Sequence, residues 1–371
     1  MAERSGAGRP RRVVHVTEAP LGGVATYLDE LLTAQLALSP DTQFDLISPE
    51  VNRAALTFGE RSNFTFIGME MRRGNRRDLI SLAWRTIRHI RRTRPAILHI
   101  HSSYAGAAIR ALSAFIPRGT RVVYCPHGWA FSREGSRKMQ RGVAAVERAL
   151  SRVTDRIICI SDYERREALS VGIGAAKLAV IDNGISPRGD RPALPASDPD
   201  APLRIAFAGR FDRQKGYDAF LEVMERLGPR ATGHAIGSAI VSSDALPPVP
   251  ENVELLGWQK REAVFDLFRR ADLLLVPSRW EGFGLVAVEA MQARLAVFAS
   301  RVGGLQDIVV DGETGRLFTP DRVDEIVALI EAARSHDLRR YGDAGYARFV
   351  EKYTAERMAR EVNALYAELL T

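Results

Sequence analysis

The sequence predicts an α/β protein built from two doubly wound domains. Its 371 residues exceed the size of one ordinary domain. Short apolar runs alternate with longer amphipathic segments, which is typical of βαβ units and parallel sheets. Residues 186–202, rich in proline and small polar residues, interrupt the alternation once. We therefore expect domains at 1–187 and 203–350 that face each other across a cleft, a linker at 188–202, and a final helix at 351–371 that packs back towards the N-terminal domain.

The first domain starts with an apolar strand and then alternates regularly. The expected strands cover 11–17, 44–48, 63–68, 96–102, 121–128, 156–161 and 178–184. The expected helices cover 24–38, 78–92, 138–151 and 163–170. Ligands of such sheets bind outside the carboxyl ends of the strands, so the loops after the strands are where chemistry is expected.

The second domain restarts the same pattern after the linker. Its expected strands cover 203–210, 234–240, 252–258, 272–278 and 295–300. Its expected helices cover 217–227, 261–270 and 285–293, and residues 316–320 with further helices complete the chain.

Composition indicates a globular protein, with 46% hydrophobic and 26% charged residues. No apolar run reaches the ~18 residues of a membrane-spanning helix, and no signal-peptide core follows the basic first residues. We therefore expect a cytoplasmic protein. Cys125 and Cys159 each lie in an apolar run and are too few for a disulfide framework, so we expect buried thiols in a reducing compartment.

The histidines predict no metal site. His99 and His101 are two residues apart on an expected strand and therefore share a face. No carboxylate or cysteine of the sequence completes a ligand set beside them, so we expect no metal.

Charge is distributed unevenly around a net +7. Residues 1–187 hold 28 basic and 17 acidic side chains, a net +11, whereas residues 188–371 hold 24 and 28, a net −4. The first half is thus expected to face an anionic partner: nucleic acid, an anionic membrane surface or a phosphorylated substrate. The sequence contains no helix-turn-helix, zinc-finger or aromatic RNA-binding pattern, so we expect no nucleic acid.

An arginine-rich segment, residues 72–94, accounts for much of this charge. On a helix it forms one apolar stripe, made of Leu79, Leu82, Ala83, Ile87 and Ile90. Five cations surround the stripe: Arg77, Arg85, Arg88, Arg91 and Arg92. One interpretation is an ordinary helix with a solvated charged face. The other is a patch that docks on anionic lipid or guides a lipid-diphosphate acceptor.

The loop after the strand at 203–210 has the composition of a phosphate site. Gly209, Arg210, Lys215 and Gly216 lie between that strand and a helix. Two cations, with glycines that let backbone N–H groups approach, suit a phosphate. An ordinary surface loop is the alternative.

A second loop combines glycines with two carboxylates. Glu281 precedes Gly282 and Gly284, and Glu289 lies on the helix that follows. The glycines free the N–H groups at the helix start to face an anion. One carboxylate is then placed to bind the far end of a ligand, and the other to bind a pair of hydroxyls. The alternative is that both glutamates are simply solvated.

With five further motifs, these loops resemble the retaining glycosyltransferases of family 4, which have the GT-B fold of two Rossmann-like domains facing across a cleft. The resemblance covers nearly the whole chain. In the family's order the motifs are PLGG (Gly22, Gly23), PHG (His127, Gly128), TDRIICIS (Ser161), NGI (Asn183, Gly184), GRFDRQKG, EGFGLVAVE and VGGLQDIVVDGETGRLF.

The resemblance implies roles for the second domain. Arg210 and Lys215 would hold the diphosphate of a nucleotide-sugar donor and stabilise charge on the leaving group. Glu289 would accept hydrogen bonds from the ribose hydroxyls. Glu281 and the N–H groups of residues 283–285 would position the donor sugar and its phosphate.

The implied site includes further residues. His127 would touch the donor sugar; the alternative is that its side chain is buried in the core. Gly23 would let the first loop approach the phosphate. The other donor-binding residues would be Gly209, Phe283, Gly284 and Leu285. Further cleft positions would be Gly22, Ser161, Asn183, Gly184, Gly237 and Leu256, with residues 256–259 at the base end.

The implied reaction is transfer of a hexose from a UDP- or GDP-linked donor with retained anomeric configuration. It needs no cofactor and no metal. The implied acceptor is a glycan or a polyprenyl-diphosphate-linked glycan, as in exopolysaccharide, O-antigen or glycolipid synthesis. The protein would lie peripherally on the inner face of the cytoplasmic membrane. A nucleotide-sugar epimerase of the same fold and an inactive sugar-nucleotide binding module are the alternatives.

The sequence departs from the family in three places. Arg294 and Ala296 stand where a glycine and a proline are usual, and a non-glycine in a left-handed helix cap costs up to ~1 kcal/mol. Ala239 replaces a second glycine after the strand at 234–240, so that loop is expected to differ. Gln306 and Asp307 replace the usual proline and glutamate.

Overall fold

The computed structural model describes residues 11–20, 22–72, 75–132, 135–189, 201–239 and 248–371. These residues form two compact units. Unit 1 combines Met1–Ser186 with Ala355–Thr371, and unit 2 is Pro187–Thr354. Most of the expected linker, at 190–200, lies outside the described residues.

Unit 1 contains a parallel seven-stranded sheet of order β3-β2-β1-β4-β5-β6-β7. Its strands are β1 (Arg12–Thr17), β2 (Gln43–Pro49), β3 (Phe64–Met69), β4 (Ile97–His101), β5 (Arg121–Cys125), β6 (Arg156–Cys159) and β7 (Leu178–Val180). β1 pairs with both β2 and β4, so the strand order reverses there. Ligands of doubly wound sheets bind at such a switch point.

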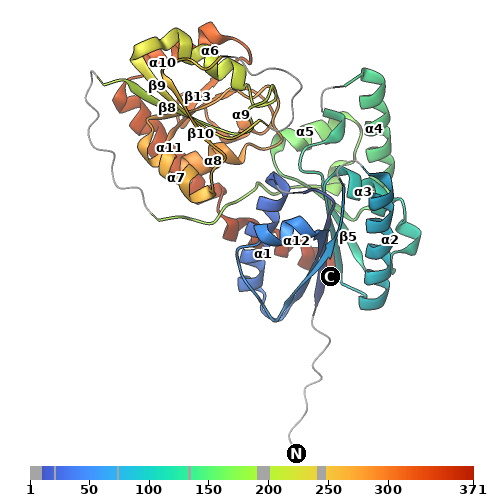
Figure 1. Ribbon diagram of the computed structural model, residues 1–371. Helices are drawn as coiled ribbons and strands as arrows, with labels where there is room; N and C mark the ends of the chain where they lie inside the picture. Colours follow the sequence, from blue (N-terminus) through green and yellow to red (C-terminus); the bar gives the residue numbers. More distant parts are fainter. Residues whose placement is uncertain (1–10, 21, 73–74, 133–134, 190–200, 240–247) are drawn as a thin grey trace, which may run out of the picture. The chain divides into compact units, whose positions relative to one another are not determined.

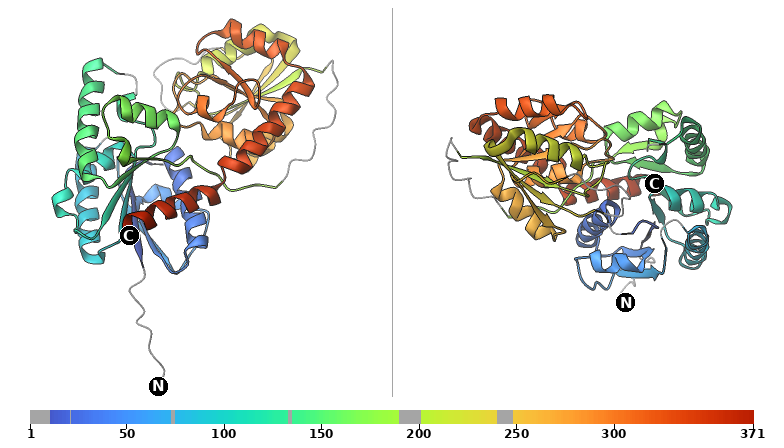
Figure 2. Two further views of the ribbon diagram at one scale, coloured as in Figure 1. Left: turned by 180° about the vertical axis from the view of Figure 1, so that it is seen from behind. Right: turned by 45° about the horizontal axis from the view of Figure 1, so that its top comes forward.

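Helices cover both faces of this sheet (Figures 1 and 2). One face carries α1 (Gly23–Leu38) and α12 (Ala355–Leu370). The other carries α2 (Arg76–Thr93), α3 (Ser103–Arg110), α4 (Arg137–Leu150) and α5 (Asp162–Ser170). Side chains alternate between the faces: Val14 and Leu98 pack towards α2 and α3, whereas His99 meets Tyr366 of α12.

The C-terminal helix α12 packs on α1. Gln35 Nε2 donates to Asn363 Oδ1 at 2.8 Å, and Ala355 N donates to Ile185 O at 3.0 Å. The helix starts at Ala355 rather than at residue 351, because α11 (Ser335–Lys352) takes up the preceding residues.

Unit 2 contains a parallel six-stranded sheet of order β10-β9-β8-β11-β12-β13. Its strands are β8 (Leu203–Ala208), β9 (Ala231–Ile236), β10 (Val253–Gly257), β11 (Leu273–Val276), β12 (Ala296–Ser300) and β13 (Gly315–Phe318). On one face lie α6 (Tyr217–Leu227) and α10 (Val323–Ala332); on the other lie α7 (Arg261–Arg270) and α8 (Leu285–Gln292), with α11 beside α8 (Figure 1). The short α9 (Leu305–Ile308) precedes β13.

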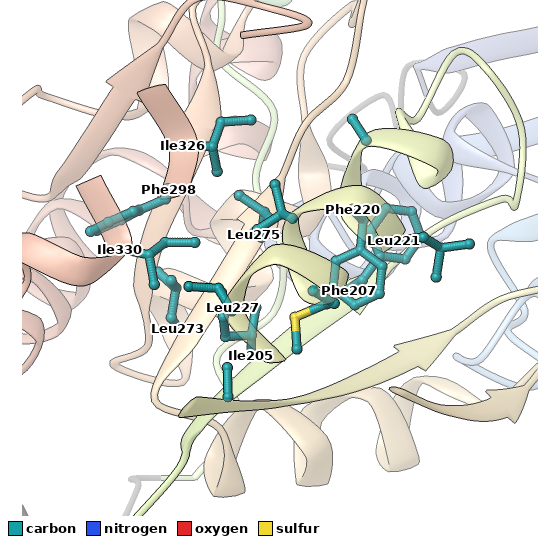
Figure 3. Packing of buried hydrophobic residues seen from close by; sticks show 14 of the residues in the cluster. Ile205, Phe207, Phe220, Leu221, Leu227, Leu273, Leu275, Phe298, Ile326 and Ile330 are labelled. Atoms are coloured by element: carbon teal, nitrogen blue, oxygen red, sulfur yellow. The ribbon is translucent and has the colours of Figure 1, made fainter. Parts of the chain in front are cut away.

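The core of unit 2 forms between the sheet and the α6–α10 layer (Figure 3). Ile205 and Leu273 of adjacent strands pack against Phe220 of α6 and Ile330 of α10. Each fully buried side chain of this kind contributes roughly 1.5–3 kcal/mol to folding. The sheet edge above this core is therefore a rigid platform for loops.

Several elements differ from the expected ones. The helix α3 was not predicted; it is short and rich in alanine, and its N-terminus is fixed by Glu18 Oε2, which accepts from Ala105 N at 3.0 Å. The strand expected at 234–240 spans Ala231–Ile236, because the backbone of Gly237 turns to φ +153°. The strand expected at 121–128 ends at Cys125, because Pro126 follows and His127 has φ +52°.

Other differences are smaller. The strand expected at 178–184 stops at Val180. The part of the chain that the structure describes also contains six short 3₁₀ helices: Glu50–Ala55, Ser113–Phe115, Ala130–Ser132, Ser151–Val153, Ala175–Lys177 and Gly228–Arg230. The left-handed cap expected at Arg294 is confirmed by its φ of +54°. Its guanidinium lies 3.9 Å from the centre of the Tyr346 ring and 3.0 Å from Asp343. Both cysteines are buried thiols, as expected.

Candidate active site

The expected donor-binding residues of unit 2 gather along the carboxyl edge of its sheet. Leu256 lies near the end of β10, and Gly237 follows β9. The 209–216 loop follows β8, and the 281–285 loop follows β11. Since these strands are neighbours, the loops share one edge, where ligands of open parallel sheets bind.

The loops after β8 and β9 touch each other. Gly209 N donates to Ile236 O at 2.9 Å, and Phe211 N donates to Ser238 O at 3.0 Å. A Cβ built on Gly237 would lie 1.8 Å from Gly209 O. Only glycine permits this approach, which fixes the start of the 209–216 loop.

Lys215 and Glu281 form an ion pair between the loops after β8 and β11. Lys215 Nζ lies 2.5 Å from Glu281 Oε2, and the side chains are 20% and 12% exposed. Ser278 Oγ donates to the same carboxylate oxygen at 3.4 Å. A Cβ on Gly216, whose φ is +66°, would lie 1.9 Å from Pro277 O, so this glycine lets the two loops meet.

Arg210 lies beside this pair. Its guanidinium is 3.2 Å from Asp212 and donates to Gln214 Oε1, and the whole side chain is 35% exposed. Gln214 Nε2 in turn donates to Trp280 O at 3.3 Å. Gln214, which sequence reasoning missed, thus links Arg210 to the backbone next to Glu281.

The N-terminus of α8 presents free backbone donors to this edge. Its N-cap is Gly284 with φ +106°, and among the described residues no side chain caps it and no acidic residue lies in its first turn. The first N–H groups of a helix have no intrahelical partner and carry a partial positive charge, which favours an anion. Phe283 is buried against Tyr353, so only its backbone is available; Leu285 is the first helical residue.

Glu289 lies just over one turn into α8. Its side chain is 25% exposed, and a carboxylate oxygen lies 3.6 Å from Arg261 of α7. The carboxylate is therefore held at the α7 side of the edge, towards β10 and Leu256.

The glycines of the first loop leave the N-terminus of α1 in unit 1 uncovered by the side chains that the structure describes. Gly22 is its N-cap with φ +138°, and Gly23 is its first residue. A Cβ on either glycine would meet no described atom within 4 Å. The first turn of α1 contains no acidic side chain. Because β1 lies at the switch point of the sheet, this N-terminus faces the position where a ligand is expected.

His127 follows β5 in a loop and is half-buried rather than part of the core. Its Nε2 lies 3.0 Å from His101 Nδ1, and its Nδ1 lies 3.7 Å from Cys125 Sγ. The ring of Tyr27 packs edge-on at 4.5 Å. Removal from water lowers the pKa of His127 to about 3, so the ring is neutral at pH 7.

His127 belongs to a cluster of histidines that the sequence did not predict as a whole. His99 and His101 share a face, as expected, and His15 of β1 joins them across the sheet. His99 Nδ1 lies 2.6 Å from Tyr366 Oη. Ligand atoms of His15, His99 and His101 lie within 4.8 Å of one another, as do those of His101, Cys125 and His127, so either group has the spacing to hold a metal ion.

A buried carboxyl, Glu164, holds the loop that carries His127. It accepts from Gly128 N at 2.5 Å and from Ile160 N at 3.0 Å. Burial raises its pKa to about 8, although both hydrogen bonds act in the opposite direction. Ser161 caps α5 by accepting from Glu164 N at 3.2 Å, so the pair has the Ser-x-x-Glu spacing of a capping box, a signal that sequence reasoning passed over.

The remaining expected cleft positions in unit 1 pack near α12. Asn183 is buried, and Gly184 N lies 3.3 Å from Met358 Sδ. Arg357 donates to Asp182 O at 2.6 Å. Asn183 Oδ1 is buried with no hydrogen-bond partner among the described residues.

The outer face of α2 combines cations with exposed apolar side chains. All five expected arginines, Arg77, Arg85, Arg88, Arg91 and Arg92, are exposed. Ile80 and Trp84, spaced by one turn, are exposed among them. The ring of Phe115 lies 5.5 Å from that of Trp84 and is exposed as well. No helix of the described residues has the length and apolar character needed to cross a membrane.

Comparisons with known proteins cover both units. Residues 21–188 match the model “Glycosyltransferase Family 4”, and residues 196–348 match “Glycosyl transferases group 1”. The chain is 31% identical over 335 residues to the “Uncharacterized 41.2 kDa protein in cps region” of Klebsiella pneumoniae. The aligned residues make up 87% of this chain and 90% of the Klebsiella protein. It is 32% identical over 245 residues to a D-inositol 3-phosphate glycosyltransferase of Mycobacterium tuberculosis, over 56% of this chain and 51% of the relative. The structure of Anabaena HepE in complex with UDP-glucose has a similar fold, with a TM-score of 0.77, 17% identity, and coverage of 96% and 99%.

Proposed function

The chain belongs to the family 4 glycosyltransferases of the group 1 type, and from this membership we propose that it moves a hexose from a UDP- or GDP-linked donor to a hydroxyl of a glycan or lipid-linked glycan. The row of cations, carboxylates and glycines along the carboxyl edge of unit 2 carries the proposal. HepE, which has a similar fold, binds UDP-glucose, and this supports a UDP-linked donor.

In this proposal Arg210 and Lys215 bind the donor diphosphate, together with the first N–H groups of α8. These groups stabilise the negative charge that develops on the leaving nucleoside diphosphate. They supply the positive charge that a divalent cation gives in other sugar transfers, so we expect full activity in EDTA.

The carboxylates bind the hydroxyl-bearing ends of the donor. Glu281 accepts hydrogen bonds from the sugar, and its ion pair with Lys215 keeps this carboxylate oriented. Glu289 accepts from the ribose hydroxyls, and residues 256–259 flank the base. The family resemblance assigns His127 a contact to the sugar as well.

The proposed chemistry retains the anomeric configuration. The bond between the anomeric carbon and the phosphate oxygen breaks, and the acceptor hydroxyl forms the new bond on the same face of the sugar. The hydroxyl proton passes to the leaving phosphate oxygen, so no protein base is needed. NMR of the product tests this step: the linkage is expected to have the anomeric configuration of the donor.

The acceptor side of the proposal is a lipid-linked glycan reached at an anionic membrane surface. The exposed face of α2 supports it, because Ile80, Trp84 and Phe115 offer apolar side chains to the interface while the surrounding arginines pair with anionic headgroups. Each cation near such a surface contributes about 1 kcal/mol. The protein is then peripheral on the inner face of the cytoplasmic membrane.

Liposome sedimentation tests this surface. With vesicles containing phosphatidylglycerol, wild-type protein is expected to sediment, and the triple variant Arg88→Glu, Arg91→Glu, Arg92→Glu is expected to stay in the supernatant. The matched control reverses three exposed arginines of unit 2, Arg270, Arg322 and Arg339, and should sediment like wild type. Sedimentation of the α2 variant would contradict the membrane proposal.

The experiment that tests the function itself is sugar transfer with and without acceptor. Wild-type protein is incubated with UDP- and GDP-hexoses, alone and with a membrane lipid extract, and the products are identified by mass spectrometry. Transfer only when acceptor is present supports the proposal. Conversion of the donor without acceptor would indicate an epimerase, and absence of any turnover would indicate a binding module; either contradicts the proposal.

A further inference from the structure

The side chain of Arg279, two residues before Glu281 in the loop after β11, is surrounded by acceptors and is 14% exposed. Its Nε donates to Asp321 Oδ1 at 2.8 Å, and its Nη1 donates to Arg213 O at 2.8 Å. Nη1 and Nη2 also donate to the two carboxylate oxygens of Asp218, each at 2.7 Å. Nη2 lies 2.7 Å from Asp321 Oδ1 as well, so each of the five N–H donors of the guanidinium faces an acceptor.

These acceptors come from both sides of β11 in the sheet. Arg213 belongs to the loop after β8 and Asp218 to the first turn of α6, whereas Asp321 follows β13. In the sheet β8 lies on one side of β11, and β13 lies on the other side, beyond β12. Asp321 has φ +61°, a left-handed conformation that aspartate adopts more readily than most residues. One side chain thus ties together three loops along the carboxyl edge of unit 2.

The backbone around Arg279 is joined to the loop after β8 as well. Arg279 N donates to Gln214 O at 2.9 Å, and Gln214 Nε2 donates to Trp280 O at 3.3 Å. Together with the bonds of the guanidinium, these contacts form a clasp between the two loops. The next residue along each segment is a member of the ion pair of the candidate site, Lys215 on one side and Glu281 on the other. The clasp therefore lies directly beside the charged pair.

We propose that Arg279 is a positioning residue that fixes Arg210 and Lys215 for the donor diphosphate without contacting the diphosphate itself. The inference rests on the proposed function, because these two cations are the ones expected to bind the diphosphate. Both lie in the loop that the clasp holds, and Arg210 also donates to Gln214 Oε1. A phosphate at the Arg279 guanidinium would have to displace Asp218 from a bidentate, charge-assisted pair. Cations that are fixed in advance, by contrast, need no reorganisation when negative charge develops.

Reductive methylation of lysines, followed by mass spectrometry of peptides, measures this positioning without any substrate. In wild type Lys215 is expected to react slowly, because its ammonium is paired and mostly buried, whereas the exposed Lys138 reacts fast. In Arg279→Ala the loop loses its ties, so Lys215 is expected to react several-fold faster while Lys138 is unchanged. The matched control is Arg301→Ala. Arg301 also joins a carboxylate and a backbone carbonyl, but both belong to residues 311–317, so this variant is expected to leave Lys215 protected.

Transfer kinetics test whether the effect of Arg279 passes through Lys215. Arg279→Ala is expected to lower kcat/KM about 10²-fold, the order of loss that a misplaced group causes in a site built for proximity. In a Lys215→Ala background the same substitution is expected to cause a much smaller loss, because the cation that it would misplace is already absent. Equal losses in the two backgrounds would show that Arg279 acts independently of Lys215, and would overturn the inference.

A milder variant keeps the test decisive if Arg279→Ala fails to fold. Asp321→Gly removes one carboxylate partner without backbone strain, because glycine adopts φ +61° readily, and it leaves the pair between Arg279 and Asp218 in place. Lys215 is expected to react faster in this variant too. Protection of Lys215 in every variant that folds would overturn the inference, and loss of transfer with Lys215 still protected would indicate that Arg279 binds the phosphate directly. Absence of transfer by wild type would refute the proposed function, while the labelling would still show whether Arg279 positions Lys215.

Discussion

Lys215 Nζ lies 2.5 Å from Glu281 Oε2, although 66 residues separate the two in the sequence. They meet because β8 and β11 are paired neighbours in a parallel sheet, so the loops that follow the two strands emerge at the same edge. The cation that we propose for the phosphate and the carboxylate that we propose for the sugar hydroxyls are thereby fixed side by side.

Substitution Lys215→Ala is expected to lower kcat by about 10²–10³, the cost of removing one donor from a developing negative charge. Stability should change little, because partly exposed ion pairs contribute only about 0–1 kcal/mol. Transfer rates and urea unfolding provide the two measurements. The control is Lys138→Ala on the exposed surface of α4, which should resemble wild type. Undiminished turnover by Lys215→Ala would show that Lys215 does not stabilise the leaving group.

Substitution Glu281→Gln is expected to separate nucleotide binding from turnover. Loss of the negative charge beside the diphosphate should leave the affinity for the free nucleotide unchanged or increase it. Turnover should fall, because the amide holds the sugar and Lys215 less firmly than the carboxylate does. Isothermal titration with the nucleoside diphosphate and steady-state kinetics measure the two effects. Weaker nucleotide binding with normal turnover would contradict the assigned role.

Gly303 and Gly312 form a matched pair for testing the support of the Glu281 loop. Both have positive φ, +51° and +80°, but a Cβ on Gly303 would lie 1.7 Å from Glu281 O, whereas a Cβ on Gly312 would meet no described atom within 4 Å. Gly312→Ala is expected to cost about 1 kcal/mol of backbone strain. Gly303→Ala adds a backbone clash and should cost about 3 kcal/mol or more, with loss of activity. Equal losses in urea unfolding would show that the close contact is unimportant.

Acid is expected to destabilise unit 1 through its buried histidines. Burial lowers the pKa of four of them: His15, His99, His101 and His127. Below the ordinary value of about 6.5 the unfolded chain binds protons that the folded chain does not. Each histidine therefore lowers the free energy of unfolding by about 1.4 kcal/mol per pH unit on acidification. Urea unfolding at pH 5 and pH 6.5 checks the slope, and greater stability at pH 5 would contradict it.

Two buried carboxyl groups lower the free energy of unfolding as the pH rises, which is the opposite of the effect of the histidines. Burial raises the pKa of Glu18, and it raises the pKa of Glu164 to about 8. Their contribution to stability is complete below the ordinary glutamate pKa and is lost as pH rises, for Glu164 through pH 8. Stability is therefore expected to peak near neutral pH and decline towards pH 8.5. Glu164→Gln, which stays neutral, should flatten this alkaline decline, and an unchanged decline in this variant would contradict the assignment.

Periodicity and turn residues predicted most of the fold and the loops of unit 2. Apolar alternation placed most strands within a few residues. The glycines of 209–216 and 281–285 marked two loops that lie at one edge of the sheet, and phosphate binding there stays a prediction. The helix α3 was missed because its short alanine-rich segment has too little periodicity. The strand at 231–236 was misplaced because the conformation of Gly237 is set by the backbone of Gly209, which a local pattern does not contain.

The histidine cluster marks where sequence reasoning stops. A period of two placed His99 and His101 on one face of β4, and that prediction is confirmed. Their partners come from elsewhere: His15 from β1, 86 residues before His101, and Tyr366 from α12, 267 residues after His99. Such contacts follow from strand order and from the return of the C-terminal helix, both of which are tertiary properties.

The most direct test of the central claim, that the carboxyl edge of unit 2 binds a nucleotide-sugar donor, is thermal unfolding with UDP-, GDP-, ADP- and TDP-sugars in EDTA. A ligand at a hundred times its Kd adds ~2.7 kcal/mol to the free energy of unfolding, enough for a clear rise in Tm. The account predicts that one nucleotide series raises Tm in wild type and that Lys215→Ala abolishes the rise. A panel without any shift, or a shift that disappears in EDTA, would contradict it.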